Sequence, residues 1–266
     1  MHQTVGARLT LEVIEPADVM LQIAVAHRSA LEEGLEITTD GGEAITPHEI
    51  DIPGSGRLHR FRAEKGRVEI AYDAAVSGTT SLAEVSTADE IRYLRPSRYA
   101  ESDRLMATAQ AEFAGIEEPE QLLPAISSWV GTQLSYVPGS SRPTDGAVET
   151  LLQRRGVCRD YAHLVIALLR SLDIPARLTS VYAPGLDPMD FHAVAEAALG
   201  GKWYVVDATL LAPRASLVRI STGRDAADTA FLSSYRGNVE LVDMDVLAIV
   251  DGSLPADDVK ELVSLD

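Results

Sequence analysis

Residues 156–169 read GVCRDYAHLVIALL, and this segment places the single cysteine of the chain, Cys158, directly before an apolar run with helical spacing. The thiol is therefore expected in the first turn of a helix. Unpaired backbone N–H groups and the positive end of the helix dipole favour an anion there. A cysteine in such a place can act as a thiolate nucleophile. Alternatively, Cys158 is a small buried residue that fills a gap in the core, as free cysteines often do.

The overall charge restricts the classes of partner. The chain has 266 residues, with 40 Asp and Glu against 23 Lys and Arg, and a formal net charge of −17. Nucleic-acid backbones and anionic membranes repel such a chain, so we expect neither as a partner. A single cysteine forms no internal disulfide, which is typical of a reducing compartment. With neither a secretory leader nor an apolar stretch of about 20 residues in the sequence, we expect a cytoplasmic protein.

The first third of the chain has the alternation of polar and apolar residues that marks half-buried strands. The alternation is found in residues 8–14, 20–25 and 67–73, and turn-forming residues occupy 40–42 and 53–56. This pattern predicts a small antiparallel β-sandwich over residues 1 to about 85.

The middle of the chain is helical, and strands return towards its end. Apolar residues recur at helical spacing in 101–115, 118–133, 147–154 and 158–172, and strand patterns follow in 176–182, 192–199, 203–209 and 238–250. The pair Gly200-Gly201 predicts a tight hairpin between two of these strands. Helices followed by antiparallel strands predict the α+β class.

A thiol nucleophile needs a base beside it and a third group to orient that base. His192 opens one strand of the predicted hairpin, and Asp207 lies late in the other. Because the start of one antiparallel strand lies opposite the end of the next, the two side chains are expected to be neighbours near Cys158. Taken singly, His192 suits a surface loop and Asp207 a strand-end turn. Together with Cys158 they indicate a nucleophile, a base and an orienting carboxylate.

Four sequence blocks strengthen this interpretation. GVCRD at 156–160, IPAR at 174–177, HA at 192–193 and WYVVDAT at 203–209 resemble, in this order, the blocks of bacterial transglutaminase-like proteins. The resemblance covers about residues 120–215. It implies a papain/transglutaminase-like core, in which the cysteine-bearing helix packs on an antiparallel sheet. It also implies two domains, an N-terminal β-rich domain over residues 1–95 and a catalytic domain over residues 96–266.

The same resemblance implies a role for each site residue. Cys158 is the nucleophile, His192 the general base and acid, and Asp207 the orienting residue. Tyr136 occupies the place of an oxyanion donor upstream of the cysteine, or else it is an aromatic residue of the core. Arg224, in the polar segment 219–228, either meets a substrate carboxylate or pairs with an aspartate of its own loop. The sequence has HAVAE and DAT where many relatives have HAWVE and DPT, which changes the expected shape of the substrate site.

The implied activity is thiol-dependent acyl transfer on the amide bonds of a peptide or protein, with hydrolysis the expected outcome. Transamidation of protein glutamine is the alternative within this class, and a non-catalytic interaction module that retains the fold is the alternative outside it. We expect no cofactor, because the sequence lacks a phosphate-binding glycine loop. We expect no metal, because the spacing of Cys158, Asp160 and His163 fits no zinc motif. The sequence specifies no oligomeric state, although exposed strand edges in the N-terminal region could pair.

Overall fold

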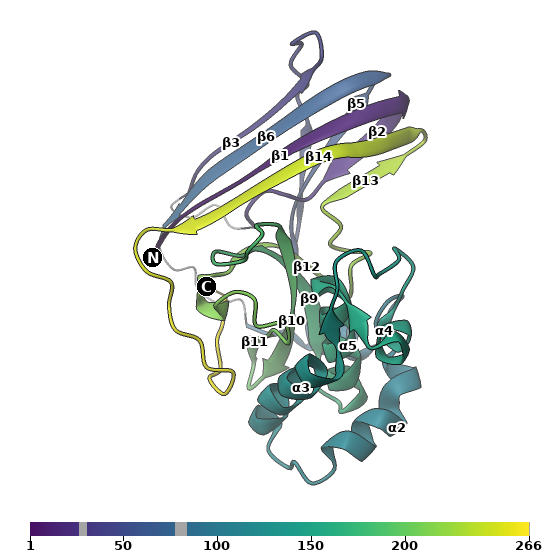
Figure 1. Cartoon of the computed structure of the whole chain (residues 1–266), viewed down its shortest axis with the longest axis vertical. Helices are drawn as coiled ribbons and strands as arrows, with labels where there is room; N and C mark the ends of the chain where they lie inside the picture. Colours follow the sequence, from purple (N-terminus) through teal and green to yellow (C-terminus); the bar gives the residue numbers. More distant parts are fainter. Residues whose placement is uncertain (27–30, 78–83, 266) are drawn as a thin grey trace.

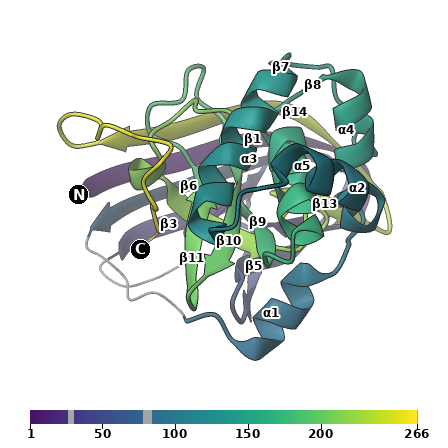
Figure 2. The same cartoon turned by 90° about the horizontal axis from the view of Figure 1, so that it is seen from below.

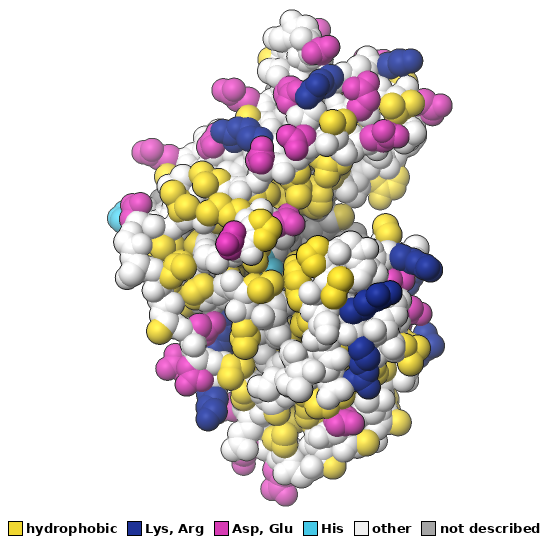
Figure 3. Space-filling view, viewed as in Figure 1, with side chains coloured by type: hydrophobic (Ala, Val, Ile, Leu, Met, Phe, Trp, Pro, Cys, Tyr) yellow, Lys and Arg dark blue, Asp and Glu magenta, His cyan; other side chains and the backbone are white. Residues whose placement is uncertain are grey.

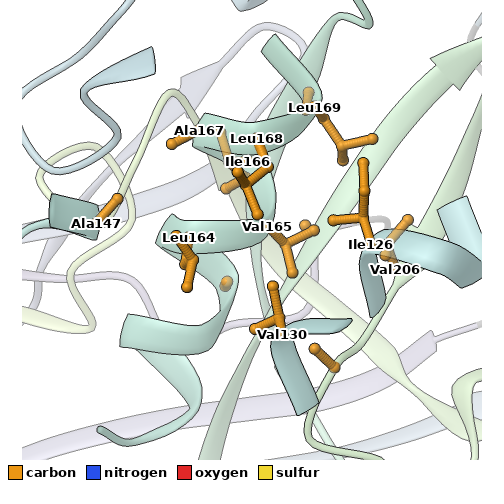
Figure 4. Close-up of a cluster of buried hydrophobic side chains, with 14 of the residues drawn as sticks. Ile126, Val130, Ala147, Leu164, Val165, Ile166, Ala167, Leu168, Leu169 and Val206 are labelled. Atoms are coloured by element: carbon orange, nitrogen blue, oxygen red, sulfur yellow. The ribbon is translucent and has the colours of Figure 1, made fainter. Parts of the chain in front are cut away.

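The apolar run after Cys158 forms helix α5 (Cys158–Ser171) in the computed structural model, which describes residues 1–26, 31–77 and 84–265. All residues of α5 from Asp160 to Ser171 are buried. Its apolar side chains share one core cluster with Ile126 and Val130 of α3 (Pro119–Gln133) and with Val206 of β11 (Lys202–Val206) (Figure 4). Burying one such side chain stabilises the fold by about 1.5–3 kcal/mol, so this cluster fixes the position of α5.

The sheet beneath α5 has the strand order β11-β10-β9-β12, and its strands pair antiparallel. It consists of β9 (Ala176–Tyr182), β10 (Phe191–Leu199), β11 and β12 (Val218–Gly223). The predicted hairpin is present, since Leu199 pairs with Lys202 around Gly200 and Gly201, whose φ angles are +56° and +80°. Glycine adopts positive φ without a steric penalty, which allows the two-residue turn.

The other helices and two short strands surround α5. They are α1 (Thr87–Leu94), α2 (Ser102–Phe113), α4 (Ala147–Gln153), β7 (Ser135–Tyr136) and β8 (Arg155–Gly156). A 3-10 turn (Arg214–Ser216) precedes β12. No helix in the described ranges has both the length and the apolar composition needed to cross a bilayer. Helices combined with mainly antiparallel sheets confirm the predicted α+β class.

The N-terminal region contains two four-stranded sheets that enclose a second core (Figure 1). One has the order β14-β1-β6-β3, and the other has the order β13-β2-β5-β4. Their strands are β1 (His2–Glu15), β2 (Ala17–Leu21), β3 (Leu31–Thr39), β4 (His48–Ile52), β5 (Gly56–Ala63), β6 (Gly66–Ser77), β13 (Leu232–Tyr235) and β14 (Asn238–Val250). Figure 2 shows the long strands of the first sheet running side by side.

The two N-terminal sheets draw on both ends of the sequence. β14 pairs with β1 in a register that places Gln3 opposite Val250, and β13 pairs with β2. The predicted division at residue 95 therefore leaves out two strands of the N-terminal sheets. Tyr182 of β9 and Ile220 of β12 also belong to the N-terminal core. The molecule therefore has two halves, the N-terminal sheets and the part built around α5 and its sheet, and they are packed together.

One predicted strand ends earlier than expected. The alternation over residues 20–25 suggests a strand to Val25, but β2 ends at Leu21. Beyond it, Gln22 donates its backbone N–H to the carbonyl of Phe231, and Ala26 donates to that of Arg219. The residues from Gln22 to Val25 are still buried, because hydrogen bonds to Phe231 and Arg219 hold this segment against the rest of the fold.

Candidate active site

Cys158 is the first residue of α5, and the preceding turn is fixed by Asp160. The Asp160 carboxylate accepts hydrogen bonds from the backbone N–H of Val157 at 2.8 Å and from Ser141 Oγ at 2.8 Å. A Cβ on Gly156 would lie 2.6 Å from the Cβ of Asp160, so only glycine fits at this position. The GVCRD segment thus places the thiol at the helix N-terminus, where the helix dipole favours negative charge.

Strands β7 and β8 bring Tyr136 to the cysteine. They pair in parallel with Tyr136 opposite Gly156, and Val137 donates its N–H to the Gly156 carbonyl at 3.0 Å. The Tyr136 hydroxyl interacts with both the backbone N–H and the thiol of Cys158. Partial burial and the charge of the Cys158 sulfur raise the pKa of Tyr136 to about 12. Tyr136 therefore keeps its proton at neutral pH and remains a hydrogen-bond donor.

His192 and Asp207 meet across the β10–β11 hairpin. The register pairs Ala195 with Val206, which places Asp207 diagonally across from His192. Nε2 of His192 and Oδ2 of Asp207 are 2.9 Å apart, and both side chains are almost completely buried. The other carboxylate oxygen, Oδ1, accepts hydrogen bonds from the backbone N–H and the hydroxyl of Thr209 at 2.8 and 2.7 Å. These contacts fix the orientation of both the carboxylate and the imidazole.

Charge around the imidazole reverses the effect of burial. Burial alone lowers the pKa of His192, but the Asp207 carboxylate and the Cys158 side chain raise it to about 10. Burial raises the pKa of Asp207, whereas His192 and the Thr209 hydrogen bonds lower it, with a net decrease. In the described part of the chain, Nδ1 of His192 is buried and has no partner with hydrogen-bond geometry. Because Nε2 is held by Asp207, Nδ1 is the ring atom available to the Cys158 thiol.

The C-terminal segment stabilises the loop that follows Asp207. Arg214, on that loop, forms an ion pair with Asp257 at 2.8 Å and donates to the carbonyl of Val205. Val205 in turn donates its backbone N–H to the carbonyl of Val263 at 2.8 Å. The segment after β14 thus lies along the outer edge of β11 and holds the strand that ends just before Asp207.

The structure places Arg224 away from this cluster. It follows Gly223, which pairs with Leu178 on β9, whereas His192 pairs with Val181 on the opposite side of that strand. Leu178 and Val181 are three residues apart, roughly 10 Å along β9. The Arg224 guanidinium forms an ion pair with Asp228 at 2.8 Å. The pair within the loop, the second interpretation of Arg224, is therefore present, whereas contact with a substrate carboxylate stays a prediction.

His163 has a structural environment. It is completely buried, stacks on Tyr99 with 5.3 Å between ring centroids, and accepts the backbone N–H of Ala226 at Nε2. Burial lowers its pKa to about 3, so the ring is neutral. Among the described residues, no group of three or more His, Cys, Asp or Glu side chains is arranged to hold a metal ion.

Several residues around the cluster were not identified from the sequence. Thr209 lies in the 203–209 block, and a hydroxyl two residues after an aspartate is a common local hydrogen-bond partner. Asp190 lies two residues before His192 and interacts electrostatically with both His192 and Tyr136. Exposed apolar side chains lie close by in sequence, Met189 before His192 and Leu210 after Asp207, at 42% and 59% exposure. Neither stands out in a sequence pattern, because exposure depends on the folded loops.

Comparison with known proteins gives the family. Residues 106–208, which include Tyr136, Cys158, His192 and Asp207, match the model of the transglutaminase-like superfamily. The crystal structure of a candidate cysteine protease from Cytophaga hutchinsonii superimposes with a TM-score of 0.88 at 34% identity, covering 98% of this chain and 96% of that one.

Two mycobacterial relatives match over shorter regions. An uncharacterised protein of Mycobacterium leprae is 30% identical over 175 residues, 63% of this chain and 62% of that protein. An uncharacterised protein of Mycobacterium tuberculosis is 38% identical over 74 residues, 26% of this chain and 24% of that protein. The matched region thus spans less than two thirds of the length of these relatives. Since the similarity to the Cytophaga hutchinsonii protein extends over nearly the whole of both chains, the chain belongs to the transglutaminase-like superfamily.

Proposed function

We propose that this protein is a thiol enzyme that cleaves amide bonds of peptides or proteins by acyl transfer, with Cys158, His192 and Asp207 as its catalytic triad. One observation carries the proposal. The buried hydrogen bond between His192 and Asp207 leaves Nδ1 of the imidazole free beside a thiol at a helix N-terminus. A protonated imidazole and the helix dipole together favour the thiolate form of a neighbouring cysteine.

The first half of the proposed reaction forms a thioester. The Cys158 sulfur attacks the carbonyl carbon of the amide, and the C=O electron pair moves to oxygen. The hydroxyl of Tyr136 and the backbone N–H at the start of α5 are the donors for this oxyanion. As the intermediate collapses, the C–N bond breaks and His192 transfers its Nδ1 proton to the leaving nitrogen. An amine leaves, and the acyl group stays on sulfur.

The second half restores the thiol. Nδ1 of His192 takes a proton from a water molecule, whose oxygen attacks the thioester carbonyl, and the C–S bond breaks to release a carboxylic acid. An amine in place of water would give transamidation. One observation favours this second candidate: the Asp190 carboxylate, close to His192 and Tyr136, would attract a cationic amine. We prefer hydrolysis, because water is always present and needs no dedicated acceptor site.

A peptide and amide library separates these outcomes. Purified protein is incubated with the library in the presence and absence of a primary amine, and products are identified by mass spectrometry beside the Cys158→Ala variant. Hydrolysis yields new carboxylates, transamidation yields amine adducts, and both are expected to disappear in Cys158→Ala. Products that persist in that variant would refute the thiol mechanism, since the chain has no other cysteine. If thiol alkylation is no faster than that of a free thiol and no products form, a non-catalytic module is the better description.

A further inference from the structure

β14 is the edge strand of the first N-terminal sheet. It pairs with β1 on one side, and in the described part of the chain no strand pairs with its other side. At 13 residues, it is long for an edge strand. Long exposed edges are usually protected, because their unpaired N–H and C=O groups accept another strand. A register shift between residues 241 and 243 interrupts the first half of β14, whereas Asp243–Val250 pair without interruption.

The register shows which backbone groups are free. Asp251 donates its N–H to the His2 carbonyl, one step beyond the Gln3–Val250 pair. In an antiparallel ladder, alternate residues direct both polar groups to the same neighbour. Residues 245, 247 and 249 therefore face β1, and residues 244, 246, 248 and 250 direct their N–H and C=O groups to the open side. Four alternate residues in a row therefore offer unpaired N–H and C=O groups, which makes this edge a template for an added strand.

The open edge lies on the side of the N-terminal sheets that faces the α5 half of the molecule. Figure 1 shows β14 at the margin of the N-terminal sheets that is nearest to α5 and β10. Figure 2 places β14 on the same side of the molecule as β7 and β8, which lead to Tyr136 and Cys158. Figure 3 shows the surface hollowed between the two halves, with hydrophobic side chains on both rims and a histidine visible between them. A strand added to β14 would therefore run along the rim of this hollow.

The side chains along β14 indicate the composition of the added strand. Asp243 and Asp245 are exposed, and within the described residues neither forms an ion pair. Leu247 and Ile249, on the same face of the sheet, are each 41% exposed. Carboxylates opposite Lys or Arg and apolar side chains opposite apolar ones are the favourable cross-strand pairs. The net charge of −17 also favours a cationic partner over an anionic one.

We propose that the open edge of β14 binds an extended, basic and apolar segment of the polypeptide substrate by strand addition, which presents a neighbouring amide bond to Cys158. Binding of the segment to β14 does not depend on catalysis. Presentation of an amide bond to Cys158 rests on the proposed amide-cleaving function, and it gives the substrate class of that function. Backbone hydrogen bonds to residues 244–250 supply sequence-independent affinity, and the two aspartates select for positive charge. The exposed Met189 and Leu210, which are close in sequence to His192 and Asp207, would then contact apolar residues near the reacting bond.

Peptide binding to the Cys158→Ala variant tests the edge independently of catalysis. The probe is a fluorescent peptide of about eight residues, an ordinary strand length, that alternates Lys and Val and is N-methylated along one edge only. It can still pair through its other edge, and it does not assemble with itself into sheets. The matched control peptide is N-methylated along both edges. The control is expected to bind at least about tenfold more weakly by fluorescence anisotropy, because several backbone hydrogen bonds are lost together.

Charge reversal on the protein supplies the second arm. Asp243→Lys combined with Asp245→Lys is expected to weaken binding of the Lys-Val probe and to favour a Glu-Val probe. Asp51→Lys, on the edge strand β4 of the other sheet, is the control and should change neither. Equal affinity of the one-edge and two-edge peptides overturns the proposal. The proposal is also overturned if sedimentation detects a dimer that the probe dissociates. The edge of β14 would then bind a second copy of the chain. Binding at the edge together with no products from the peptide and amide library refutes the amide-cleaving function but not the edge.

Discussion

Replacing Asp207 by asparagine isolates the contribution of the carboxylate to the state of His192. The carboxylate accepts three hydrogen bonds, from His192 Nε2 at 2.9 Å and from the N–H and hydroxyl of Thr209 at 2.8 and 2.7 Å. An asparagine side chain keeps one acceptor oxygen, and its NH₂ group must face one of these donors. If the oxygen stays on Thr209, the NH₂ group donates to Nε2, and the ring proton moves to Nδ1. The imidazole is then neutral and no longer supplies the positive charge that favours the thiolate.

The expected size of the effect follows from the protonation of His192. Burial lowers its pKa, but the Asp207 carboxylate, together with the Cys158 side chain, opposes burial and raises the pKa to about 10. Without the carboxylate, burial dominates and the ring is neutral at pH 6. An isolated thiol, with a usual pKa of about 8.5, is only about 0.3% ionised at this pH. Loss of the imidazolium is therefore expected to slow alkylation of Cys158 at pH 6 by roughly 100-fold.

The assay is the rate of carboxamidomethylation by iodoacetamide at pH 6, followed by intact mass. Cys158 is the only cysteine, so each addition of one adduct reports on this thiol alone. Asp228→Asn is the matched control, because it removes a paired carboxylate at the Arg224 loop, away from the site. The reasoning is refuted if Asp207→Asn reacts at the rate of the unmodified protein while its circular dichroism shows a native fold.

Three further outcomes are expected. Glu196 is fully buried between Arg177 and Arg219, and although burial raises its pKa, the two guanidinium groups lower it to about 2. Its stabilising effect is present above pH 4.5 and is lost as the pH falls towards 2, so Glu196→Gln should lower the free energy of unfolding by about 3–5 kcal/mol at pH 7 and by much less at pH 2 in denaturant titrations. Gly156→Ala should destabilise the fold by about 1–3 kcal/mol and slow alkylation of Cys158, because the new methyl group overlaps the Asp160 side chain, whereas Gly34→Ala meets no atom within 4 Å and should leave alkylation unchanged. Arg224→Ala should alter neither alkylation nor amide cleavage and should change unfolding by less than about 1 kcal/mol, since its ion pair with Asp228 is exposed; a large loss of activity would return Arg224 to the site.

Local patterns predicted well the elements of the half that contains Cys158, His192 and Asp207. The strand over residues 176–182 and the helix that begins at Cys158 have the predicted bounds to within a residue, because alternation and helical spacing report directly on burial. The hairpin at Gly200-Gly201 was predictable for the same reason, since turn chemistry is local. Its register, which brings His192 to Asp207, follows from the turn and needs no long-range information.

Pairing between distant strands was not predictable in this way. The alternation over residues 238–250 correctly predicted a strand but could not identify β1 as its partner, because a period of two reports which face is buried and not which strand lies alongside. The position of the 219–228 loop was not predictable for the same reason. Closeness in sequence does not fix closeness in space, and only the β9–β12 register shows which end of the sheet the loop occupies.

The pairing of β1 with β14 has a consequence for biosynthesis. β1 lies between β14 and β6 in its sheet. Gln3 pairs with Val250, which is synthesised 247 residues later (250 − 3), so the ladder between β1 and β14 is completed late. While the ribosome is still translating, β1 has β6 beside it but an open edge on its other side. The half that contains α5 and the sheet of β9 to β12 can fold first, because its strands and helices are close in sequence. The last strands to emerge then close the N-terminal sheets, so a nascent chain that stalls before residue 238 exposes an unpaired strand to aggregation or to holding chaperones.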